Sequence, residues 1–257
     1  MPNPLVLTPL AGIPRVRPGD DLPMLLLEAL GRAEVRLEAG DILAVTQKIV
    51  SKAEGRLVHL PEVRPSPEAR RLAEESQKDP RLVEVILRES RQVMRVRPGL
   101  IIVRHRLGFV CANAGVDHSN VLGEGGPPED WVLRLPEDPD ASARRIRERL
   151  EQAAGVPLGV VILDSHGRAW RMGTVGVAIG ISGMPALLDL RGRPDLFGYR
   201  LQVTQVGIAD ELAAAVSVVT GQAAEGIPAV HVRGLPYPLR EGSLGELIRP
   251  EEQDLFR

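Results

Sequence analysis

Two polar segments hold the residue types that chemistry on phosphate or carboxylate groups requires. Residues 113–120 place two amides, a carboxylate, an imidazole and a hydroxyl within eight positions, with Gly115 among them. Glycine in such a segment lets backbone N–H groups approach an anion closely. The alternative is a turn in which Asn and Asp side chains bond their own backbone. We interpret the segment as functional, because so dense a polar cluster rarely serves only a turn.

The second segment, residues 164–168, reads Asp-Ser-His-Gly-Arg and directly follows the unbroken apolar run at 158–163. Such a run predicts a strand that is buried on both faces. A carboxylate at the carboxyl end of a buried strand points into the usual ligand crevice. An Asp followed by a hydroxyl residue suits a hard cation that keeps several waters, as magnesium does beside phosphates. The alternative is that Asp164 only caps the next turn.

Lysine is rare in this chain: three of the 32 basic residues are lysines, namely Lys48, Lys52 and Lys78. Two of them lie in the short segment 46–52. A lysine ammonium acts as a point charge on phosphate, unlike the guanidinium fork of arginine. The pair therefore predicts a phosphate contact, with chance clustering as the alternative. A third polar segment, residues 221–226, by itself indicates no more than a glycine stop at the end of a helix.

Composition excludes several classes of protein. The chain has 257 residues, is 44% hydrophobic and 26% charged, and carries a formal net charge of −2. These values are typical of a globular protein whose core needs no disulfide or metal to fold. The nearly neutral charge gives no electrostatic argument for nucleic acid or an anionic membrane as the partner. A single cysteine, Cys111, excludes an internal disulfide and fits a reducing compartment.

Targeting segments and several common motifs are absent from the sequence. Residues 1–20 lack the basic start and apolar stretch of a secretory signal, and the longest uncharged run, 172–188, is shorter than a membrane helix of about 20 residues. We therefore expect a cytoplasmic protein. No GxxxxGK[ST] loop, GxSxG elbow, HExxH or CxxC occurs, so a standard P-loop is excluded and zinc is not expected. Four arginines near polar segments, each more typical of a surface residue, are alternative anion contacts: Arg168, Arg171, Arg191 and Arg193.

The strands and helices that must position these segments do not alternate strictly along the chain. This order predicts an α+β fold with mixed and antiparallel sheets and flanking helices. The predicted strands are 5–7, 41–50, 100–103, 108–112, 158–163, 174–181, 201–208 and 227–232. The predicted helices run from a cap at Asp20 or Asp21 to Leu30, over 67–77, over 80–93, from a cap at Asp140 to a stop at Gly155, and over 209–220. Residues 123–140, rich in Gly, Pro and acidic residues, are predicted to form a loop.

Five sequence blocks together resemble one family. In chain order they are 50–56, 113–117 with 119–120, 164–168, 176–183 and 226–229. Their order and spacing are similar to those of the coenzyme F420-0:γ-glutamyl ligases from about Gly12 to Gly234. The resemblance implies a GTP-dependent ligase that adds L-glutamate to the lactyl carboxylate of the deazaflavin precursor, coenzyme F420-0 or its dehydro form. GTP would phosphorylate that carboxylate, and the glutamate amine would attack the acyl phosphate to give an amide, GDP and phosphate.

The resemblance also implies cofactors and assembly. Family members use divalent manganese or magnesium, here two ions, with a monovalent cation such as potassium, and form an intertwined homodimer of two-lobed protomers. Some bacterial relatives carry a flavin-binding domain after the ligase. This chain ends at Arg257, so we expect residues 1–257 to form the ligase unit alone.

The resemblance also implies a role for individual positions of this sequence. The implied catalytic residues are Asp117, Asp164 and Lys52. The implied metal ligands are Asp117, Asp164, Ser165 and Gln222. The implied nucleotide contacts are Gly12, Ile13, Pro14, Arg15, Gln47, Lys52, Asn120, Thr220, Gly221, Ala223, Ala224, Glu225, Gly226 and Ile227.

Three of these positions depart from some relatives. Ser165 replaces a threonine and keeps the hydroxyl. Gln222 replaces a glutamate, so a second metal loses a charged ligand and should bind more weakly. Gln47 replaces a serine, which leaves that nucleotide contact open.

Two other functions remain open. One is a metal-dependent carboxylate–amine ligase or phosphohydrolase that acts on a different acid. The other is a non-catalytic protein that binds GTP or the deazaflavin without consuming either. Substrate profiling separates the first from the implied ligase, and turnover of GTP separates the second.

Overall fold

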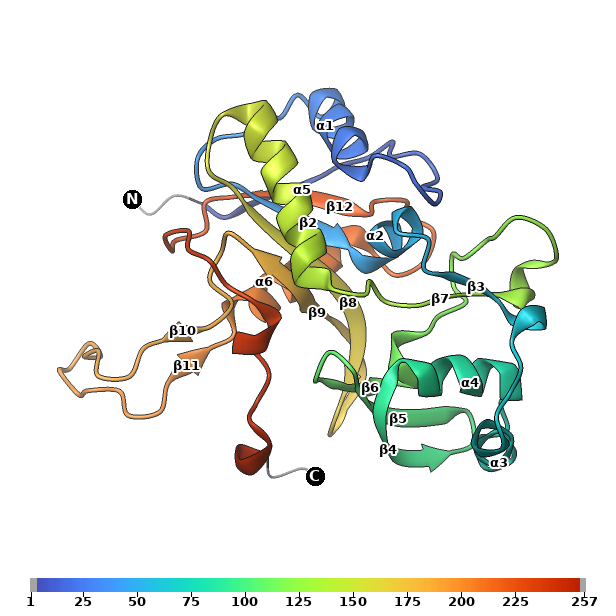
Figure 1. Cartoon of the computed structure of the whole chain (residues 1–257). Coiled ribbons are helices and arrows are strands. Elements are labelled where there is room, and N and C mark those ends of the chain that lie inside the picture. The colour runs from blue at the N-terminus through green and yellow to red at the C-terminus, as the bar shows by residue number, and fades with distance from the viewer. Residues whose placement is uncertain (1–3, 255–257) are drawn as a thin grey trace.

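A five-stranded mixed sheet lies at the centre of the protein, which we describe from a computed structural model for residues 4–254 (Figure 1). The strand order is β1-β12-β2-β8-β9; β2 and β8 are parallel and the other neighbours are antiparallel. The strands are β1 (Val6–Pro9), β12 (Ala229–Arg233), β2 (Ile42–Thr46), β8 (Gly159–Arg168) and β9 (Arg171–Ser182). The ends of the predicted 1–257 unit, residues 1–3 and 255–257, lie outside the described residues.

Both faces of this sheet are buried, which explains its unbroken apolar runs. In β2, Leu43 and Val45 point into one core, whereas Ile42 and Ala44 point into another, as the two-residue period of a strand requires. The first core is covered by α1 (Leu22–Arg32) and α5 (Pro139–Ala154), and the second by α6 (Ile208–Thr220). Gly180 permits the close approach of α5, because a Cβ there would lie 2.5 Å from the carbonyl oxygen of Pro139.

A second, three-stranded sheet has its own core. The order is β4-β5-β6, all antiparallel. Helices α3 and α4 pack against it, and Leu72, Ile86, Ile101 and Val103 are buried between them. The elements are α3 (Pro67–Ser76), α4 (Pro80–Arg88), β4 (Ser90–Arg97), β5 (Leu100–His105) and β6 (Val110–Ala112).

Short elements complete the fold. They are α2 (Gln47–Ala53), β3 (Leu57–His59), β7 (Trp131–Leu133), β10 (Leu188–Asp189), β11 (Gln205–Val206) and the 3-10 turns Leu60–Glu62, Asn113–Gly115, Pro128–Asp130, Leu244–Glu246 and Glu251–Gln253. Strands β3 and β7 pair with each other, and β10 and β11 form the base of an arm that projects from the body (Figure 1). The observed architecture confirms the predicted α+β class with mixed and antiparallel sheets. Between residues 4 and 254, no helix combines the length and the apolar character needed to cross a membrane.

Helix-capping signals in the sequence are confirmed at most helix ends. The side chains of Asp21, Ser66 and Asp79 each accept a backbone N–H in the first turn of α1, α3 and α4. Gly155 ends α5 in the left-handed conformation. The cap of α5 is Asp138 and not Asp140, so that prediction is wrong. Asp140 instead accepts the N–H groups of Ile181 and Leu244 and ties the C-terminal region to β9.

Three strand or helix predictions need correction. The expected strand 41–50 ends at Thr46, and its second half is α2. The expected helix 80–93 ends at Arg88, and β4 begins at Ser90, because Val93 and Val96 pack against the core of the second sheet. The expected strand 201–208 is reduced to Gln205–Val206, since residues 201–204 make only irregular backbone hydrogen bonds with residues 190–193 of the arm and α6 begins at Ile208.

Two further boundaries differ from expectation. The predicted loop 123–140 includes the short strand β7, which pairs with β3. Strand β8 runs to Arg168 and thus contains residues 164–168, which were expected to follow it. The strand continues because β9 supplies hydrogen-bonding partners along its whole length. Asp164 therefore lies within the β8–β9 hairpin, at the point where β8 passes from the buried core to solvent.

Candidate active site

The parallel pairing of β2 with β8 brings two of the predicted segments together. Thr46 at the end of β2 is in register with Leu163, so α2 starts beside the point where the polar part of β8 begins. The carboxyl ends of parallel strands are the usual place for a ligand crevice in such sheets. Lys48 and Lys52 are four residues apart on α2 and so lie on the same side of that helix.

Lys48 forms an ion pair with Asp117. Its Nζ lies 2.8 Å from Asp117 Oδ2 and also donates to the Ser119 carbonyl oxygen at 2.8 Å. The backbone of Asp117 is fixed by reciprocal hydrogen bonds with Leu133, at 3.1 and 2.9 Å. Partial burial opposes ionisation of Asp117, but hydrogen bonds from Lys48 and Ser119 outweigh it and hold the pKa of the carboxyl below its ordinary value. Asp117 is therefore an anion at neutral pH.

Lys52 reaches the same loop. Its Nζ donates to the carbonyl oxygen of Asn120 at 2.7 Å, and the Asn120 side chain donates to the carbonyl oxygen of Ala223 at 2.9 Å. Burial lowers the pKa of the Lys52 ammonium, and the charges of Lys48 and Arg15 lower it further. Those two cations repel Lys52, so binding of an anion beside them would relieve the repulsion. Positive charge thus gathers at α2 and the segment before α1.

The segment after α6, residues 221–227, borders the candidate site on another side. Gly221 has φ +69°, and a Cβ there would lie 2.2 Å from the carboxyl carbon of Glu225, so only glycine fits. Glu225 accepts the N–H of Ala223 and shapes this turn. Gln222 Oε1 accepts a hydrogen bond of 2.8 Å from the hydroxyl of Ser165 on β8. One pair of implied metal ligands is therefore in direct contact.

The carboxylate of Asp164 contacts His166, which in turn packs against Phe109. Its Oδ2 lies 3.0 Å from Nε2 of His166, and the ring of His166 contacts Phe109 at a centroid distance of 5.3 Å. The buried Cys111 is close enough to Asp164 to feel its charge; burial, with that charge, raises the pKa of the thiol to about 12. Cys111 is thus a neutral thiol and no nucleophile at neutral pH.

Hydrogen bonds and ion pairs thus connect α2, the 113–120 segment and the segment after α6, and Ser165 joins this last segment to β8. The implied metal set consists of two carboxylates, a hydroxyl and an amide, all hard oxygen donors of the kind that magnesium and manganese accept. Within residues 4–254, no three His, Cys, Asp or Glu side chains gather as a ready-made metal site. The ammonium of Lys48 neutralises Asp117, so a cation there would compete with this lysine.

The other implied nucleotide contacts flank this network. The segment 12–15 lies between β1 and α1, and the Gly12 carbonyl oxygen accepts a hydrogen bond from Arg32. Pro14 and Arg15 line a hollow of about 490 Å³ together with residues of the first turn of α1. Gln47 is buried and accepts a hydrogen bond from Ser51, so its amide is already engaged. Thr220, at the end of α6, is buried, whereas Ala224, Gly226 and Ile227 lie in the exposed or half-exposed connection to β12.

The sequence predicted a phosphate contact for the lysine pair, but only Lys52 was named among the implied site residues. The signal was the four-residue spacing of Lys48 and Lys52, which on a helix puts both ammonium groups on one side. Reading 41–50 as a strand hid this relation, because four residues of strand span about 13 Å. The partner role of His166 to Asp164 was also missed.

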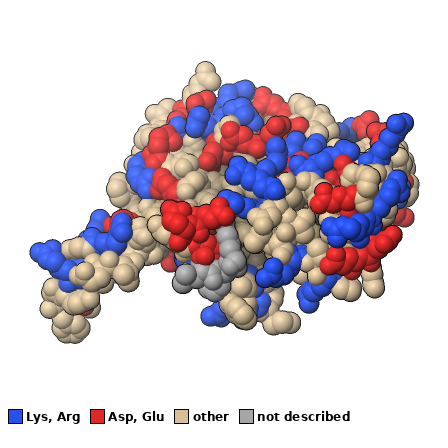
Figure 2. All heavy atoms as spheres, turned by 60° about the horizontal axis from the view of Figure 1, so that its bottom comes forward, with Lys and Arg blue, Asp and Glu red and all other residues tan. Residues whose placement is uncertain are grey.

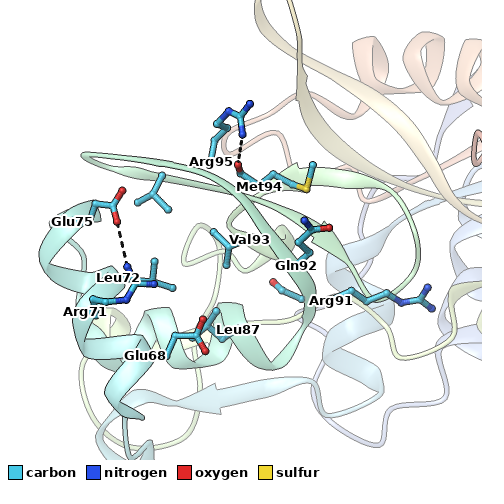
Figure 3. A pocket seen from close by; sticks show the side chains of 12 residues that line it. Glu68, Arg71, Leu72, Glu75, Leu87, Arg91, Gln92, Val93, Met94 and Arg95 are labelled. Atoms are coloured by element: carbon cyan, nitrogen blue, oxygen red, sulfur yellow. Dashed lines mark hydrogen bonds and ion pairs between the residues drawn. The ribbon is translucent and has the colours of Figure 1, made fainter. Parts of the chain in front are cut away.

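A larger groove, of about 700 Å³, lies elsewhere, between α3 and the edge strand β4 (Figure 3). Its floor is apolar, with Leu72, Leu87 and Val93, and charged side chains line its rim. The rim residues Arg71 and Glu75 pair with each other at 3.8 Å. None of the implied site residues lines this groove.

Comparisons with known proteins identify a family whose model covers these segments of the chain. A family model described as F420-0:gamma-glutamyl ligase matches residues 12–234. The coenzyme F420:L-glutamate ligase of Methanopyrus kandleri is 51% identical over 247 residues, covering 95% of this chain and 94% of the relative. The enzymes of the same name from Methanothermobacter thermautotrophicus and Archaeoglobus fulgidus are 48% and 43% identical, each covering at least 95% of both chains. Because the match spans nearly the whole chain and every segment of the network, this protein belongs to the F420-0:γ-glutamyl ligase family.

Proposed function

We propose that this protein is the GTP-dependent ligase that joins L-glutamate to the lactyl carboxylate of coenzyme F420-0, or of its dehydro form, in coenzyme F420 biosynthesis. The observation that carries the proposal is the meeting of Lys48 and Lys52 with the loop of Asp117 and Asn120. Two ammonium groups beside a carboxylate and exposed backbone suit a triphosphate and its counter-ion. Family membership over residues 12–234 supports the choice of substrates.

In this mechanism the protein positions charge around a phosphoryl group. GTP transfers its terminal phosphoryl group to the lactyl carboxylate, and the amine of L-glutamate then attacks the resulting acyl phosphate, releasing phosphate and forming the amide. Lys52, whose ammonium is crowded by Lys48 and Arg15, contributes positive charge against the phosphates. Asn120 and the turn at Gly221 shape the side on which the nucleotide lies.

Divalent manganese or magnesium would be held by Asp117, Asp164, Ser165 and Gln222, whose donors are all oxygens. When bound, the metal supplies neutralising charge for the transferring phosphoryl group. The ion pair with Lys48 keeps the carboxylate of Asp117 ionised. Gln222 brings no charge, so of two ions the one at Ser165 and Gln222 would bind more weakly. A monovalent cation such as potassium is part of the same proposal.

The protomer is proposed to have two lobes, one for each sheet, and to act as a homodimer. The arm between β10 and β11 supports this assembly, because Leu196 and Phe197 on it are 97% and 95% exposed. Figure 2 shows the arm standing clear of the body, with basic groups along it and a mostly uncharged tip. An apolar tip of this kind is costly in water and favours burial against a partner. We further propose a cytoplasmic location, which the free thiol of Cys111 supports.

The direct test is mass spectrometry of the deazaflavin precursor after incubation with the protein, GTP, L-glutamate and manganese. A product heavier by one or more glutamyl units, absent without GTP, is the expected result. GDP release with unchanged precursor would instead indicate a ligase or phosphohydrolase for another acid. Binding of GTP or deazaflavin without turnover of either would indicate a non-catalytic protein.

A further inference from the structure

The β8–β9 hairpin extends well beyond the rest of the central sheet (Figure 1). Arg168 and Arg171 are paired in register at its tip, and Ala169 and Trp170 form the connection between them. The indole of Trp170 is 89% exposed. Tryptophan is one of the costliest side chains to leave in water, and this chain contains only two. An exposed tryptophan at a hairpin tip therefore calls for a binding partner.

The backbone of Trp170 is also unusual. Its φ is +64°, in the left-handed region that bulky residues rarely occupy. Glycine or asparagine would satisfy this turn more easily. Such conformations persist mainly where the side chain has a function. The turn thus keeps an indole where folding alone favours a smaller residue.

Two arginines flank Trp170 in this hairpin tip without a carboxylate to balance them. Among the described residues, neither Arg168 nor Arg171 forms an ion pair, and Arg168 donates to the carbonyl oxygen of Gly173, at 3.3 Å. An exposed indole in the same tip as two unpaired cations is complementary to an aromatic ligand that carries negative charge.

We propose that Trp170, Arg168 and Arg171 form a subsite for the aromatic end of an elongated anionic substrate whose carboxylate reacts near Asp164. Arg168 follows Asp164 by four residue steps along β8, a span of about 13 Å. The reacting group and the ring must therefore lie at opposite ends of the ligand. This inference rests on the proposed function, in which the ligand is the deazaflavin precursor: its ring stacks on Trp170 and its negative charge faces the arginines.

The projecting arm is a better candidate than the hairpin tip for contacts between two copies of this chain. The arm at residues 190–204 exposes Leu196, Phe197 and Val203, which are apolar, and it stands clear of the body. The hairpin tip combines one indole with two unpaired guanidinium groups and continues the strand that carries Asp164 and Ser165. This continuity with the strand of the candidate site favours a substrate subsite at the tip.

The test is a fluorescence titration of the whole protein with the purified deazaflavin precursor, combined with glutamyl-transfer kinetics. Quenching of tryptophan emission should be lost in Trp170→Phe and retained in Trp131→Phe, which removes the only other tryptophan. In kinetics, Trp170→Ala should raise the KM for the precursor about tenfold, the factor that corresponds to about 1.4 kcal/mol. The kcat at saturating precursor and the KM for GTP should not change. Trp170→Phe, which keeps an aromatic face, should recover most of the KM.

The outcomes distinguish a failure of the subsite proposal from a failure of the proposed function. Transfer by the wild type with an unchanged KM in Trp170→Ala would overturn the subsite and leave the ligase intact. Quenching at Trp170 without any transfer would support the subsite and overturn the ligase. Loss of dimer mass in Trp170→Ala, measured by light scattering, would overturn the subsite in favour of an assembly role.

Discussion

Two carboxylates that are paired with cations, Glu89 and Asp117, lie in different surroundings. Glu89 is 3% exposed and is surrounded by Arg106, Arg134 and Arg56, with N–O distances of 2.8, 3.0 and 3.1 Å. Asp117 pairs with one cation, Lys48, at 2.8 Å, and its side chain is 41% exposed. Glu89 is saturated with partners and closed to water. Asp117 keeps lone pairs and an open side on which another group can bind.

The comparison separates a structural cluster from a functional one. The three arginines come from the connection between α2 and β3, the β5–β6 turn and the residue after β7, so Glu89 joins the three-stranded sheet to the β3–β7 pair. Removing a partner from such a buried cluster leaves uncompensated charge in a medium that solvates it poorly. Asp117 is half-exposed and Asp164 lies where β8 leaves the core, so their loss should affect chemistry more than stability. The predictions below test this division.

The largest expected effect is on activity. Asp117→Asn and Asp164→Asn should each abolish glutamyl transfer, because each removes a negative charge that the proposed metal requires. Stability should change by no more than about 1–2 kcal/mol, as for site residues outside the core. Mass spectrometry of the product and urea unfolding measure the two quantities. Full activity in either variant would contradict the metal assignment.

The largest expected effect on stability is at the other cluster. Glu89→Gln removes the charge that three arginines share, and we expect the free energy of unfolding to fall by about 3–5 kcal/mol. Urea unfolding followed by circular dichroism measures it. The folded fraction should keep its KM for GTP, since Glu89 does not contact the candidate site. An unchanged midpoint would show that Glu89 is not the structural counterpart of Asp117.

A smaller effect should appear with pH. Burial lowers the pKa of His105, which is fully buried beside Glu89 and Arg106, to about 4. Between pH 6.5 and 4 the unfolded chain binds a proton that the folded protein does not, so stability should fall as the pH is lowered through this window. The loss attributable to His105 should be at most about 3 kcal/mol.

The matched variant is His105→Asn, which offers an acceptor for the Leu107 N–H that His105 Nδ1 now accepts. Unfolding midpoints of both proteins should be compared at pH 7.5, 6 and 4.5. The variant should lose part of the pH slope. An identical slope in both proteins would assign the acid sensitivity to other groups.

The smallest effect is expected at the groove between α3 and β4. Arg71→Ala removes a surface ion pair with Glu75 at 3.8 Å and should change stability by less than about 0.5 kcal/mol, with transfer activity unaffected. The variant is a control for the two charge clusters. A marked loss of activity would indicate that this groove takes part in function.

Local sequence determined much of this protein. The apolar runs in β2 and β8 and the caps at Asp21, Ser66 and Asp79 follow from hydrophobic patterning and hydrogen-bonding chemistry within a few residues. The polar segments 113–120 and 164–168 were also found from residue types alone. These features are local, so an isolated sequence contains the information that specifies them.

Tertiary structure decided the rest. Whether 47–50 is strand or helix depends on partners: neither β8 nor β12 pairs with β2 beyond Thr46, so the chain turns into α2. That turn places Lys48 beside Asp117, which follows it by many residues, and no local pattern encodes such a contact. Likewise, residues 201–204 have strand propensity, but their neighbour in the arm, residues 190–193, forms only irregular backbone hydrogen bonds with them. Side chains become a site or a structural cluster through the packing of distant segments, because burial and the number of opposite charges are set only when the sheets assemble.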